Sequence, residues 1–373
     1  MNKLVFLGGE DVSARIEISK KFMAFGYKIE IIGTQNEAIF IKNNIPYKKY
    51  TLNREFNIFN DLKTIFELRK ILKKLDKETI VHAFDTKPTL YLPIAALGLS
   101  NIKVVRTITG MGRIFTEENI KNTILKLIYN VVQKAVNYRV DFTVFQNDDD
   151  YNYFIKYNLV KIDKTKVIKS SGLDIEKFIT SLNKDLNSLK ESLKIRDKTT
   201  FILVSRMVKQ KGILYYLEAA KLCHENGYDF NFLLVGQLDT DKSITLNEIE
   251  EYSPYVTYLG RREDVKELLQ ISDIFVLPTY YREGVPRVLL EASALGLPLI
   301  TTNMPGCKDV VIENYNGKLV KIKNSEDLYK AMITLANEDT SLYSLNAKEK
   351  VKEFDLNKIV NQYNDVYKKI GDK

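Results

Sequence analysis

Two glutamates in the stretch YYREGVPRVLLEASALGLPLITTNMPG, residues 280–306, could do chemistry on a polyhydroxylated ligand. Glu283 comes just before a proline-opened helix, and Glu291 lies eight residues later among leucines and alanines. A charge among apolar residues is costly to desolvate unless something pairs with it. The two oxygens of a carboxylate can accept hydrogen bonds from adjacent hydroxyls, so Glu291 is suited to bind a vicinal diol. The alternative is that Glu291 pairs with a neighbouring basic residue.

The elements around these glutamates place them beside the start of a helix. DIFVLPT, residues 273–279, predicts a strand, and Pro286 suits the first helical position because its missing N–H would have no partner there. Gly296 is a natural end for this helix. Free N–H groups at a helix start form an anion site. Glu283 and Gly284 lie in the loop at its mouth, where the backbone can approach a ligand closely.

Two cations follow another predicted strand. SRMVKQKGI places Arg206 and Lys211 at and just after the carboxyl end of the predicted strand FILVSR, in the same half of the chain as the two glutamates. A diphosphate leaving group develops negative charge, which two fixed cations would stabilise. The alternative is that both are solvated surface charges; their position at a strand end, together with the family resemblance described below, favours phosphate binding.

Short apolar runs alternate with helical segments in both halves of the chain. Runs of four to seven apolar residues between helices predict parallel strands covered on both faces. The expected fold class is α/β, with two doubly wound Rossmann-like domains facing a central cleft and ligands at the carboxyl ends of the strands. We expect domains at residues 1–178 and 190–354, with a helix at 355–373 that packs back on the first. Strands are expected within residues 3–9, 27–33, 79–84, 103–108 and 142–146, and within residues 199–206, 229–236, 255–260, 273–279, 297–302 and 317–322.

The composition is that of a globular protein. Of the 373 residues, 45% are hydrophobic and 28% charged, and no apolar run reaches membrane-spanning length. The N-terminus reads as a first strand rather than a signal peptide. The two cysteines are expected to be packing residues, and two histidines cannot form a histidine-rich metal site. The net charge of +8 suits an anionic substrate or an acidic membrane surface, and no nucleic-acid recognition motif is present.

The ordered set of motifs resembles a known family. EGVPRVLLE is similar to the E-x7-E motif of the retaining glycosyltransferases of family 4, which have the GT-B fold, and the resemblance extends over nearly the whole chain. It implies that Glu291 binds the ribose of a nucleotide-sugar donor and that Glu283 contacts the transferred sugar. It also implies catalytic roles for Glu283, Arg206 and Lys211. The further donor-binding residues that it implies are Gly284, Val285, Pro286, Arg287, Gly8 and Gly9.

The first half contributes weaker signals. FLGGED contains Gly8 and Gly9 but lacks the G-x-G-x-x-G pattern of a dinucleotide site. In RTITGMGRIF, Thr109 stands where many family members have a histidine that contacts the donor sugar, and it is followed by Gly110. Thr109 and Gly110 are therefore expected sugar contacts. Asp85 and Lys87, which follow TIVHAF, are expected acceptor contacts, and His82 is interpreted as a core histidine.

An acidic triplet could suggest a metal site. NDDDY places Asp148, Asp149 and Asp150 after the strand FTVFQ, where acidic residues cap a helix start and complement its dipole. We interpret the triplet in this way. The resemblance implies that no metal and no other cofactor is required.

The sequence therefore predicts a retaining, metal-independent glycosyltransferase. By resemblance to its subgroup, it would move a hexose or N-acetylhexosamine from a nucleotide sugar, expected to be a UDP sugar, to a saccharide on undecaprenyl diphosphate. The alternatives are an epimerase or hydrolase acting on a nucleotide sugar, and a non-catalytic sugar-binding subunit of a transferase complex. A dinucleotide-dependent oxidoreductase lacks its fingerprint.

A lipid-linked acceptor implies contact with a membrane. We expect a cytoplasmic protein associated peripherally with the inner face of the cell membrane. Residues 58–75 and 120–136 predict amphipathic helices whose apolar faces mostly pack on the sheet, with rim lysines near an anionic bilayer.

Overall fold

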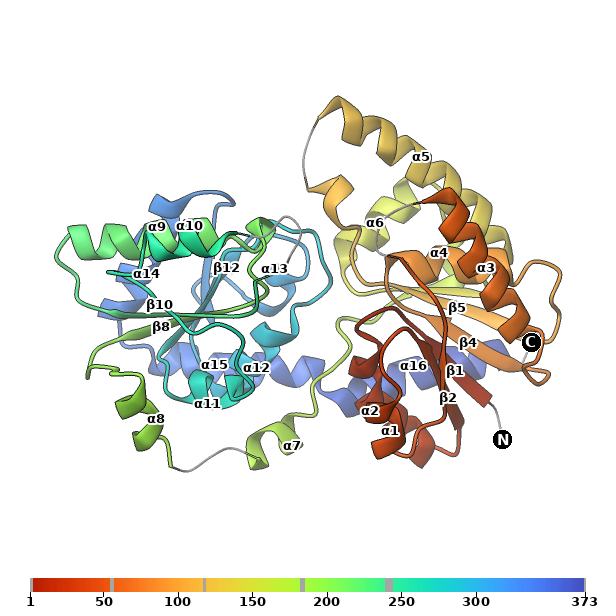
Figure 1. The fold of residues 1–373 in the computed structure, drawn as a ribbon, viewed down its shortest axis with the longest axis horizontal. Helices are drawn as coiled ribbons and strands as arrows, with labels where there is room; N and C mark the ends of the chain where they lie inside the picture. Colours follow the sequence, from red (N-terminus) through yellow and green to blue (C-terminus); the bar gives the residue numbers. More distant parts are fainter. Residues whose placement is uncertain (1–2, 54–56, 117–118, 182–184, 239–243, 372–373) are drawn as a thin grey trace. The chain divides into compact units, whose positions relative to one another are not determined.

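The computed structural model describes residues 3–53, 57–116, 119–181, 185–238 and 244–371. The described chain forms two compact units, the first of residues 1–172 with 356–373 and the second of residues 173–355. Each unit is built on its own parallel sheet (Figure 1).

The first unit contains a sheet of seven strands within the described residues, in the order β3-β2-β1-β4-β5-β6-β7. All the ladders are parallel, and the central strands are buried on both faces. Such strands read as continuous apolar runs because helices cover both sides. The strands are β1 (Lys3–Leu7), β2 (Lys28–Gly33), β3 (Tyr47–Lys49), β4 (Thr79–Ala83), β5 (Ile102–Ile108), β6 (Phe142–Phe145) and β7 (Thr165–Val167).

Helices form a layer on each face of this sheet. Leu4 and Phe6 share one apolar core with α1 and α16, whereas Val5 and Leu7 share another with α3 and α4. This division follows from the alternation of side chains along a strand. The helices are α1 (Ile16–Ala24), α2 (Ala38–Lys42), α3 (Ile58–Leu72), α4 (Thr86–Ala95), α5 (Ile120–Val136), α6 (Asp148–Lys156) and α16 (Leu356–Gly371).

The last helix, α16, belongs to the first unit, and a buried polar cluster joins it to β4 and β5. The His82 ring lies 2.6 Å from Tyr367 Oη and 2.7 Å from Thr107 Oγ1, and all three side chains are buried. Gly172 has a φ of +84°, and a Cβ there would lie 2.9 Å from Leu356 Cα. Glycine at this position therefore allows the chain to pass closely beside the start of α16.

In the described part of the second unit, six parallel strands follow the order β10-β9-β8-β11-β12-β13. Helices α9 and α14 cover one face, and α11, α12 and α13 share the core of the other. The strands are β8 (Thr200–Val204), β9 (Asn231–Val235), β10 (Thr257–Tyr258), β11 (Ile274–Leu277), β12 (Leu299–Thr302) and β13 (Gly317–Val320). The helices are α7 (Ile175–Thr180), α8 (Asn187–Ser192), α9 (Ile213–Glu225), α10 (Leu246–Glu250), α11 (Val265–Gln270), α12 (Arg287–Leu295), α13 (Cys307–Val310), α14 (Ser325–Asn337) and α15 (Ser341–Val351).

The predicted α/β class with two Rossmann-like domains is confirmed, and the differences lie at the edges of the sheets. The edge strands β3 and β7 were not expected, because three residues each, YKK and TKV, give no apolar run. The sequence placed the domain limits at residues 178 and 190, whereas the units divide between residues 172 and 173. Helices α7 and α8 belong to the second unit because Phe178 and Leu189 pack against its core.

Both cysteines are packing residues, as expected. Cys223 and Cys307 are buried in the cores of the second unit. Burial raises the pKa of each thiol to about 12.

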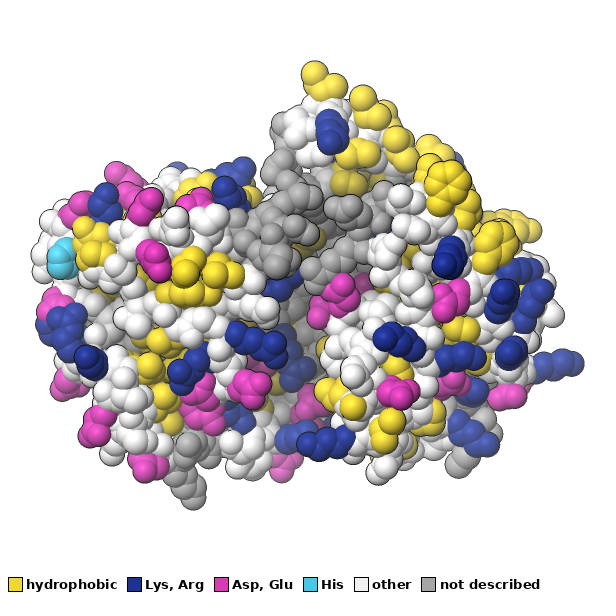
Figure 2. All heavy atoms as spheres, in the orientation of Figure 1, with side chains coloured by type: hydrophobic (Ala, Val, Ile, Leu, Met, Phe, Trp, Pro, Cys, Tyr) yellow, Lys and Arg dark blue, Asp and Glu magenta, His cyan; other side chains and the backbone are white. Residues whose placement is uncertain are grey.

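The amphipathic helix α5 differs from expectation. Its apolar side chains were expected to pack mostly on the sheet, but the buried side chains described for α5 are only Gln133 and Val136. Figure 2 shows hydrophobic side chains gathered on the outside of this region. No helix within the described ranges is long and apolar enough to cross a membrane.

Candidate functional site

The central point of the second sheet brings two predicted catalytic residues together. Strands β8 and β11 are adjacent, and their loops leave the sheet at the same edge. Lys211 ends a 3₁₀ turn in the loop after β8, and Glu283 lies in the loop after β11. Lys211 Nζ lies 2.5 Å from Glu283 Oε1, and the two side chains are only 14% and 21% exposed. In an open α/β sheet, this point between the first and fourth strands is where ligands bind.

The two loops are joined by their backbones as well. The amide of Tyr280 donates to the carbonyl of Gln210 at 2.9 Å, and Thr279 Oγ1 donates to the same oxygen at 3.1 Å. Gly212 has a φ of +79°, and a Cβ there would overlap the carbonyl of Pro278. Glycine is therefore required for the loop after β8 to approach the end of β11.

Two more glycines bring neighbouring loops together in the same way. Gly306 has a φ of +82°, and a Cβ on it would overlap the carbonyl of Gly284. Gly236 follows β9, and a Cβ there would overlap the carbonyl of Ser205. Gly212, Gly236 and Gly306 were not among the predicted site residues. A glycine directly after a strand, or at the start of the next helix, was the available signal.

Helix α12 presents the second glutamate near its first turn. Pro286, expected at the first helical position, is instead the capping residue with φ −64° and ψ 122°, and Arg287 begins the helix. Gly296 ends it in the left-handed conformation, as predicted. Glu291 was expected to be buried, but its side chain is 21% exposed and accepts from Arg287 Nε at 3.0 Å. This pairing with a basic neighbour is the alternative that the sequence had left open.

Arg206 and the predicted donor-binding residues next to Glu283 lie in the same two loops. Arg206 is exposed and lies two residues after the end of β8. Gly284 is buried and Val285 half-buried between Glu283 and the start of α12. The structure therefore places Arg206 and Lys211 in the loop after β8 and residues 283–286 in the loop after β11, with Arg287 and Glu291 in the first two turns of α12.

The equivalent point of the first sheet holds a strained aspartate. Asp85 follows β4, and its carboxylate accepts from the Gly9 amide, in the loop after β1, at 2.8 Å. Gly8 is fixed in the same loop because its amide donates to Ile32 O at 3.0 Å and its carbonyl accepts from Tyr50 Oη at 3.1 Å. Asp85 has φ 67° and ψ 157°, a region of backbone space that is essentially restricted to glycine. Such strain persists where surrounding contacts enforce it, and it is concentrated at functional sites.

Lys87 is engaged by a different helix. Its ammonium lies 2.9 Å from Asp61 Oδ1 of α3, and the two side chains are only 8% and 15% exposed. Burial opposes ionisation of Asp61, but the hydrogen bonds from Lys87, Tyr91 and the Asn57 amide, with the positive charge of Lys87, together outweigh it and lower the pKa of that carboxyl. Lys87 therefore ties α4 to α3. Asp85 and Lys87 both line a cavity of about 240 Å³ with Gly9, Leu52, Asn53 and Pro88.

Thr109 and Gly110 lie just beyond β5 and are half-buried. Gly110 has a φ of +126°, which only glycine adopts readily. His82, by contrast, is a core residue, as expected. Burial holds the pKa of its ring well below the usual value.

The acidic triplet lies in the first turn of α6. Asn147 caps this helix by accepting from the Asp150 amide at 2.7 Å, and its own side-chain amide donates to Asp150 Oδ2 at 3.0 Å. Asp148 pairs with Lys169 at 2.9 Å. The cap is thus Asn147, and the aspartates are placed to interact with the helix dipole. Among the residues that the structure describes, no group of three or more acidic, histidine or cysteine side chains could hold a metal ion.

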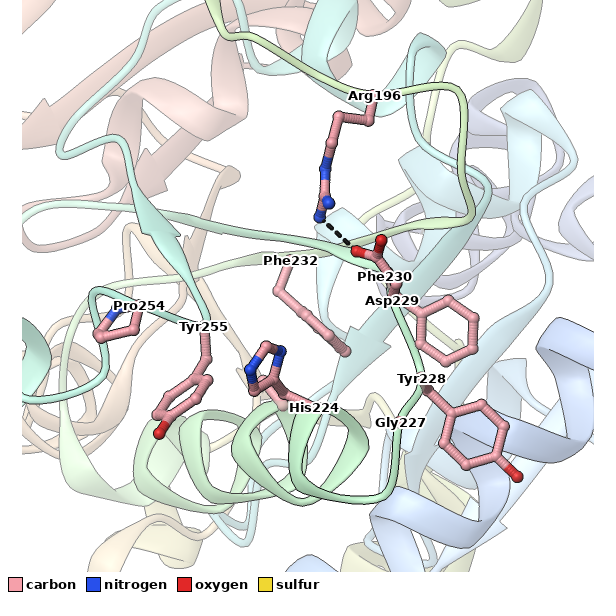
Figure 3. A pocket seen from close by; sticks show the side chains of 10 residues that line it. Arg196, His224, Gly227, Tyr228, Asp229, Phe230, Phe232, Pro254 and Tyr255 are labelled. Carbon is pink, nitrogen blue, oxygen red and sulfur yellow. Dashed lines mark ion pairs between the residues drawn. The ribbon is translucent and has the colours of Figure 1, made fainter.

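A cavity of about 400 Å³ in the second unit lies elsewhere (Figure 3). Its lining includes His224 of α9, the segment 227–230 before β9, and Arg196, which pairs with Asp229 at 2.6 Å. These residues precede the amino end of β9, the edge opposite to Lys211 and Glu283. Ligands of open α/β sheets bind at the carboxyl edge, so this cavity is not the candidate site.

The chain belongs to the glycosyltransferases. The family "Glycosyl transferases group 1" matches residues 185–353, and "Glycosyl transferase 4-like" matches residues 3–171. The two units thus correspond to the two halves of a GT-B glycosyltransferase, and the resemblance found in the sequence is confirmed.

Particular relatives act on lipid-linked sugars. The chain is 32% identical over 324 residues to the UDP-Gal:alpha-D-GlcNAc-diphosphoundecaprenol alpha-1,3-galactosyltransferase of Escherichia coli, covering 85% of this chain and 82% of the relative. It is 30% identical over 320 residues to the N,N'-diacetylbacillosaminyl-diphospho-undecaprenol alpha-1,3-N-acetylgalactosaminyltransferase of Campylobacter jejuni, covering 84% and 83%. Anabaena HepE, solved with UDP and glucose, has the same fold, with a TM-score of 0.79 at 19% identity over 99% of this chain and 100% of that one.

Proposed function

We propose that this glycosyltransferase moves a hexose or N-acetylhexosamine from a UDP sugar to a saccharide carried on undecaprenyl diphosphate, with retention of the anomeric configuration. The substrate class is supported by the Escherichia coli and Campylobacter jejuni relatives, whose names specify undecaprenol diphosphate-linked acceptors. The UDP donor is supported by the Escherichia coli relative.

The observation that carries the proposal is the Lys211–Glu283 pair at the carboxyl ends of β8 and β11. A nucleotide sugar presents a diphosphate next to a ring of hydroxyls. A cation and a carboxylate 2.5 Å apart suit these two features, with Lys211 on the diphosphate and Glu283 on the sugar hydroxyls. Arg206, on the same loop as Lys211, would add a second charge on the leaving group.

Glu291 would bind the ribose. Its Oε1 accepts from Arg287 at 3.0 Å, which fixes the side chain along α12, and a carboxylate has further acceptor capacity for two hydroxyls. The backbone of Gly284, Val285 and Pro286 lies before the first turn of α12, whose free amides favour an anion. These contacts would orient the donor before reaction.

The chemical step needs little from the protein beyond positioning. The acceptor hydroxyl oxygen would form a bond to the anomeric carbon as the bond from that carbon to the donor phosphate oxygen breaks. The acceptor proton would pass to a phosphate oxygen on the same face, and UDP would leave with its charge stabilised by Arg206 and Lys211. No protein base is then required.

The first unit would bind the acceptor. The carboxylate of Asp85 is aimed at the Gly9 amide beside a cavity of about 240 Å³, and it can accept a hydrogen bond from an acceptor hydroxyl. Gly8 and Gly9 would allow close approach of a phosphate or sugar, and Thr109 and Gly110 would contact the transferred sugar. Lys87 would act indirectly, because its ammonium is held by Asp61.

Two further features belong to the proposal. Catalysis would not need a metal ion, since Arg206 and Lys211 supply positive charge at the diphosphate. The chain would work at the inner face of the cell membrane, where a polyprenyl-linked acceptor is held.

The proposal is tested with purified chain, a panel of UDP, GDP, ADP and TDP sugars, and a short-chain polyprenyl diphosphate-linked saccharide. We expect transfer from a UDP sugar and an unchanged rate in EDTA. NMR of the product should show that the transferred sugar keeps the anomeric configuration that it had in the donor. Inversion, a requirement for added manganese or magnesium, or epimerisation or hydrolysis of the donor without transfer would overturn the corresponding part of it.

A further inference from the structure

The apolar side chains of α5 form a continuous stripe that faces solvent. They recur at the spacing of a helix face, at positions 120, 124, 127, 128, 131 and 132. Ile120, Leu127 and Val131 are 83%, 63% and 69% exposed. The side of α5 that packs inward carries Gln133 and Val136. An apolar stripe normally faces the core, so this exposed stripe indicates a surface that something else covers.

Helix α3 extends the same surface. Ile58, Phe59 and Phe66 are 76%, 84% and 63% exposed, whereas Leu68 and Leu72 of the same helix are buried. Both α3 and α5 pack against α4, on the same face of the first sheet. Figure 2 shows hydrophobic side chains along α5 and on toward α3, with Lys and Arg side chains beside them. The apolar face is defined as Ile58, Phe59, Leu62, Phe66, Ile120, Ile124, Leu127, Ile128, Val131 and Val132.

The charges on these two helices are mainly positive. The α5 segment contains no aspartate or glutamate, and its Lys121 and Lys134 are exposed. Lys63 and Lys70 of α3 are exposed, as are Lys73 and Lys74 directly after it.

The acidic residues of α3 are turned to other partners. Asp61 is paired with Lys87, and Glu67 accepts from the amide of Thr51 at 3.1 Å. The rim therefore offers cations to whatever covers the apolar face.

We propose that the apolar face docks on an anionic phospholipid bilayer, with α3 and α5 lying in the interface and the lysines against the headgroups. A helix with a large apolar face and lysines on its flank binds in this way. A second copy of the chain fits less well, because it would bring two sets of lysines together. The docking face is argued from exposure and charge alone. It rests on the proposed function only for the reason to dock, which is to hold the enzyme where a lipid-linked acceptor lies.

The test is co-sedimentation with phosphatidylglycerol-containing vesicles. We expect the wild type to sediment, to be released by salt, and to ignore neutral vesicles. The double substitution Leu127→Glu and Val131→Glu should weaken binding at least tenfold. The matched control is Leu342→Glu with Leu345→Glu on α15 of the second unit, whose side chains are 65% and 64% exposed, and it should bind as the wild type does.

A second variant tests the charges separately. Changing Lys70, Lys73 and Lys74 to glutamine should weaken vesicle binding by about 100-fold, since each lysine near an anionic surface contributes about fivefold. All substituted side chains are exposed, so thermal melting should remain as in the wild type.

Donor binding and transfer to a short-chain, water-soluble acceptor should also be unchanged in these variants. If that transfer fails in the wild type while vesicle binding persists, the proposed function is wrong and the docking face stands. Vesicle binding by the Leu127→Glu, Val131→Glu variant equal to that of the wild type would overturn the docking face. So would a wild-type dimer in solution that this variant dissociates, because a second copy would then cover the face.

Discussion

The two units place an acidic side chain at the same topological point and give it different partners. In both sheets the first and fourth strands of the unit are adjacent, as β1 and β4 in one and β8 and β11 in the other. In the second unit Glu283 meets the ammonium of Lys211 at 2.5 Å. In the first unit Asp85 meets the backbone amide of Gly9 at 2.8 Å.

The difference suits two kinds of ligand. A cation held near a carboxylate can bind a diphosphate and a sugar hydroxyl at once, which suits the proposed donor. A carboxylate that accepts from a backbone amide has further acceptor capacity for the hydroxyls of a sugar, which suits the proposed acceptor. Under the proposed function, the same fold would support two binding tasks through the residues of two loops.

The largest expected effect comes from the cation of the second unit. Lys211→Ala should lower kcat by about 100-fold, the usual effect of removing one fixed donor to a developing anion. Arg206→Ala should have a similar effect. Lys209→Ala is the matched control, because Lys209 lies in the same turn but is 53% exposed and 3.7 Å from Glu248. Steady-state kinetics measures both variants. Equal kcat values for Lys211→Ala and Lys209→Ala would show that Lys211 has no special role in catalysis.

The strained aspartate of the first unit gives the next effect. Asp85→Ala and Asp85→Gly both remove the carboxylate, so each should lower turnover roughly 10- to 100-fold, the effect of one charged hydrogen bond. Only glycine relieves a backbone at φ 67° and ψ 157°, so the glycine variant should be more stable by about 1–3 kcal/mol. Urea denaturation of the pair measures this difference. Equal stability of the two variants would show that the Asp85 backbone is not strained.

The long central strands and the loops that follow them could be predicted from the sequence, because their patterns are local. A run such as KLVFLGG specifies a buried strand, and the motif EGVPRVLLE specifies a loop and a helix start. The edge strand YKK could not be recognised, because its pairing comes from β2 rather than from its own side chains. Periodicity likewise showed that α5 is amphipathic, but not that its apolar side faces solvent.

Contacts between distant residues account for the rest. The sequence singled out Lys87, but its partner Asp61 lies 26 residues away on another helix. The positive φ of Asp85 has no sequence signal, since glycine is the usual residue in that conformation. The contact between Lys211 and Glu283, 72 residues apart, follows only once β8 and β11 are neighbours.

A smaller effect is the pH dependence of stability, which we expect from a buried histidine in the first unit and not from the exposed histidine of the second. His82 is buried and neutral in the first unit, and burial holds its pKa well below the usual value. Below about pH 6.5 the unfolded chain takes up a proton that the folded chain does not, so this group lowers the free energy of unfolding by up to about 1.4 kcal/mol per pH unit on acidification. Above that pH the contribution is constant.

Urea denaturation from pH 7.5 to 5.5 measures this slope. His82→Gln should remove it, whereas His224→Gln, an exposed position in the second unit, should leave it unchanged. The same slope in wild type and His82→Gln would assign the acid sensitivity to another group.

The central claim is that the nucleotide of the donor binds to the second unit, and calorimetric titration of a UDP sugar tests it most directly. Wild type, Glu291→Ala and Asp85→Asn are compared. Glu291→Ala should bind roughly 10- to 100-fold more weakly, the worth of one or two charged hydrogen bonds, and Asp85→Asn should bind as the wild type does. Unchanged affinity in Glu291→Ala, or an equal loss in Asp85→Asn, would contradict this division of the substrates between the units.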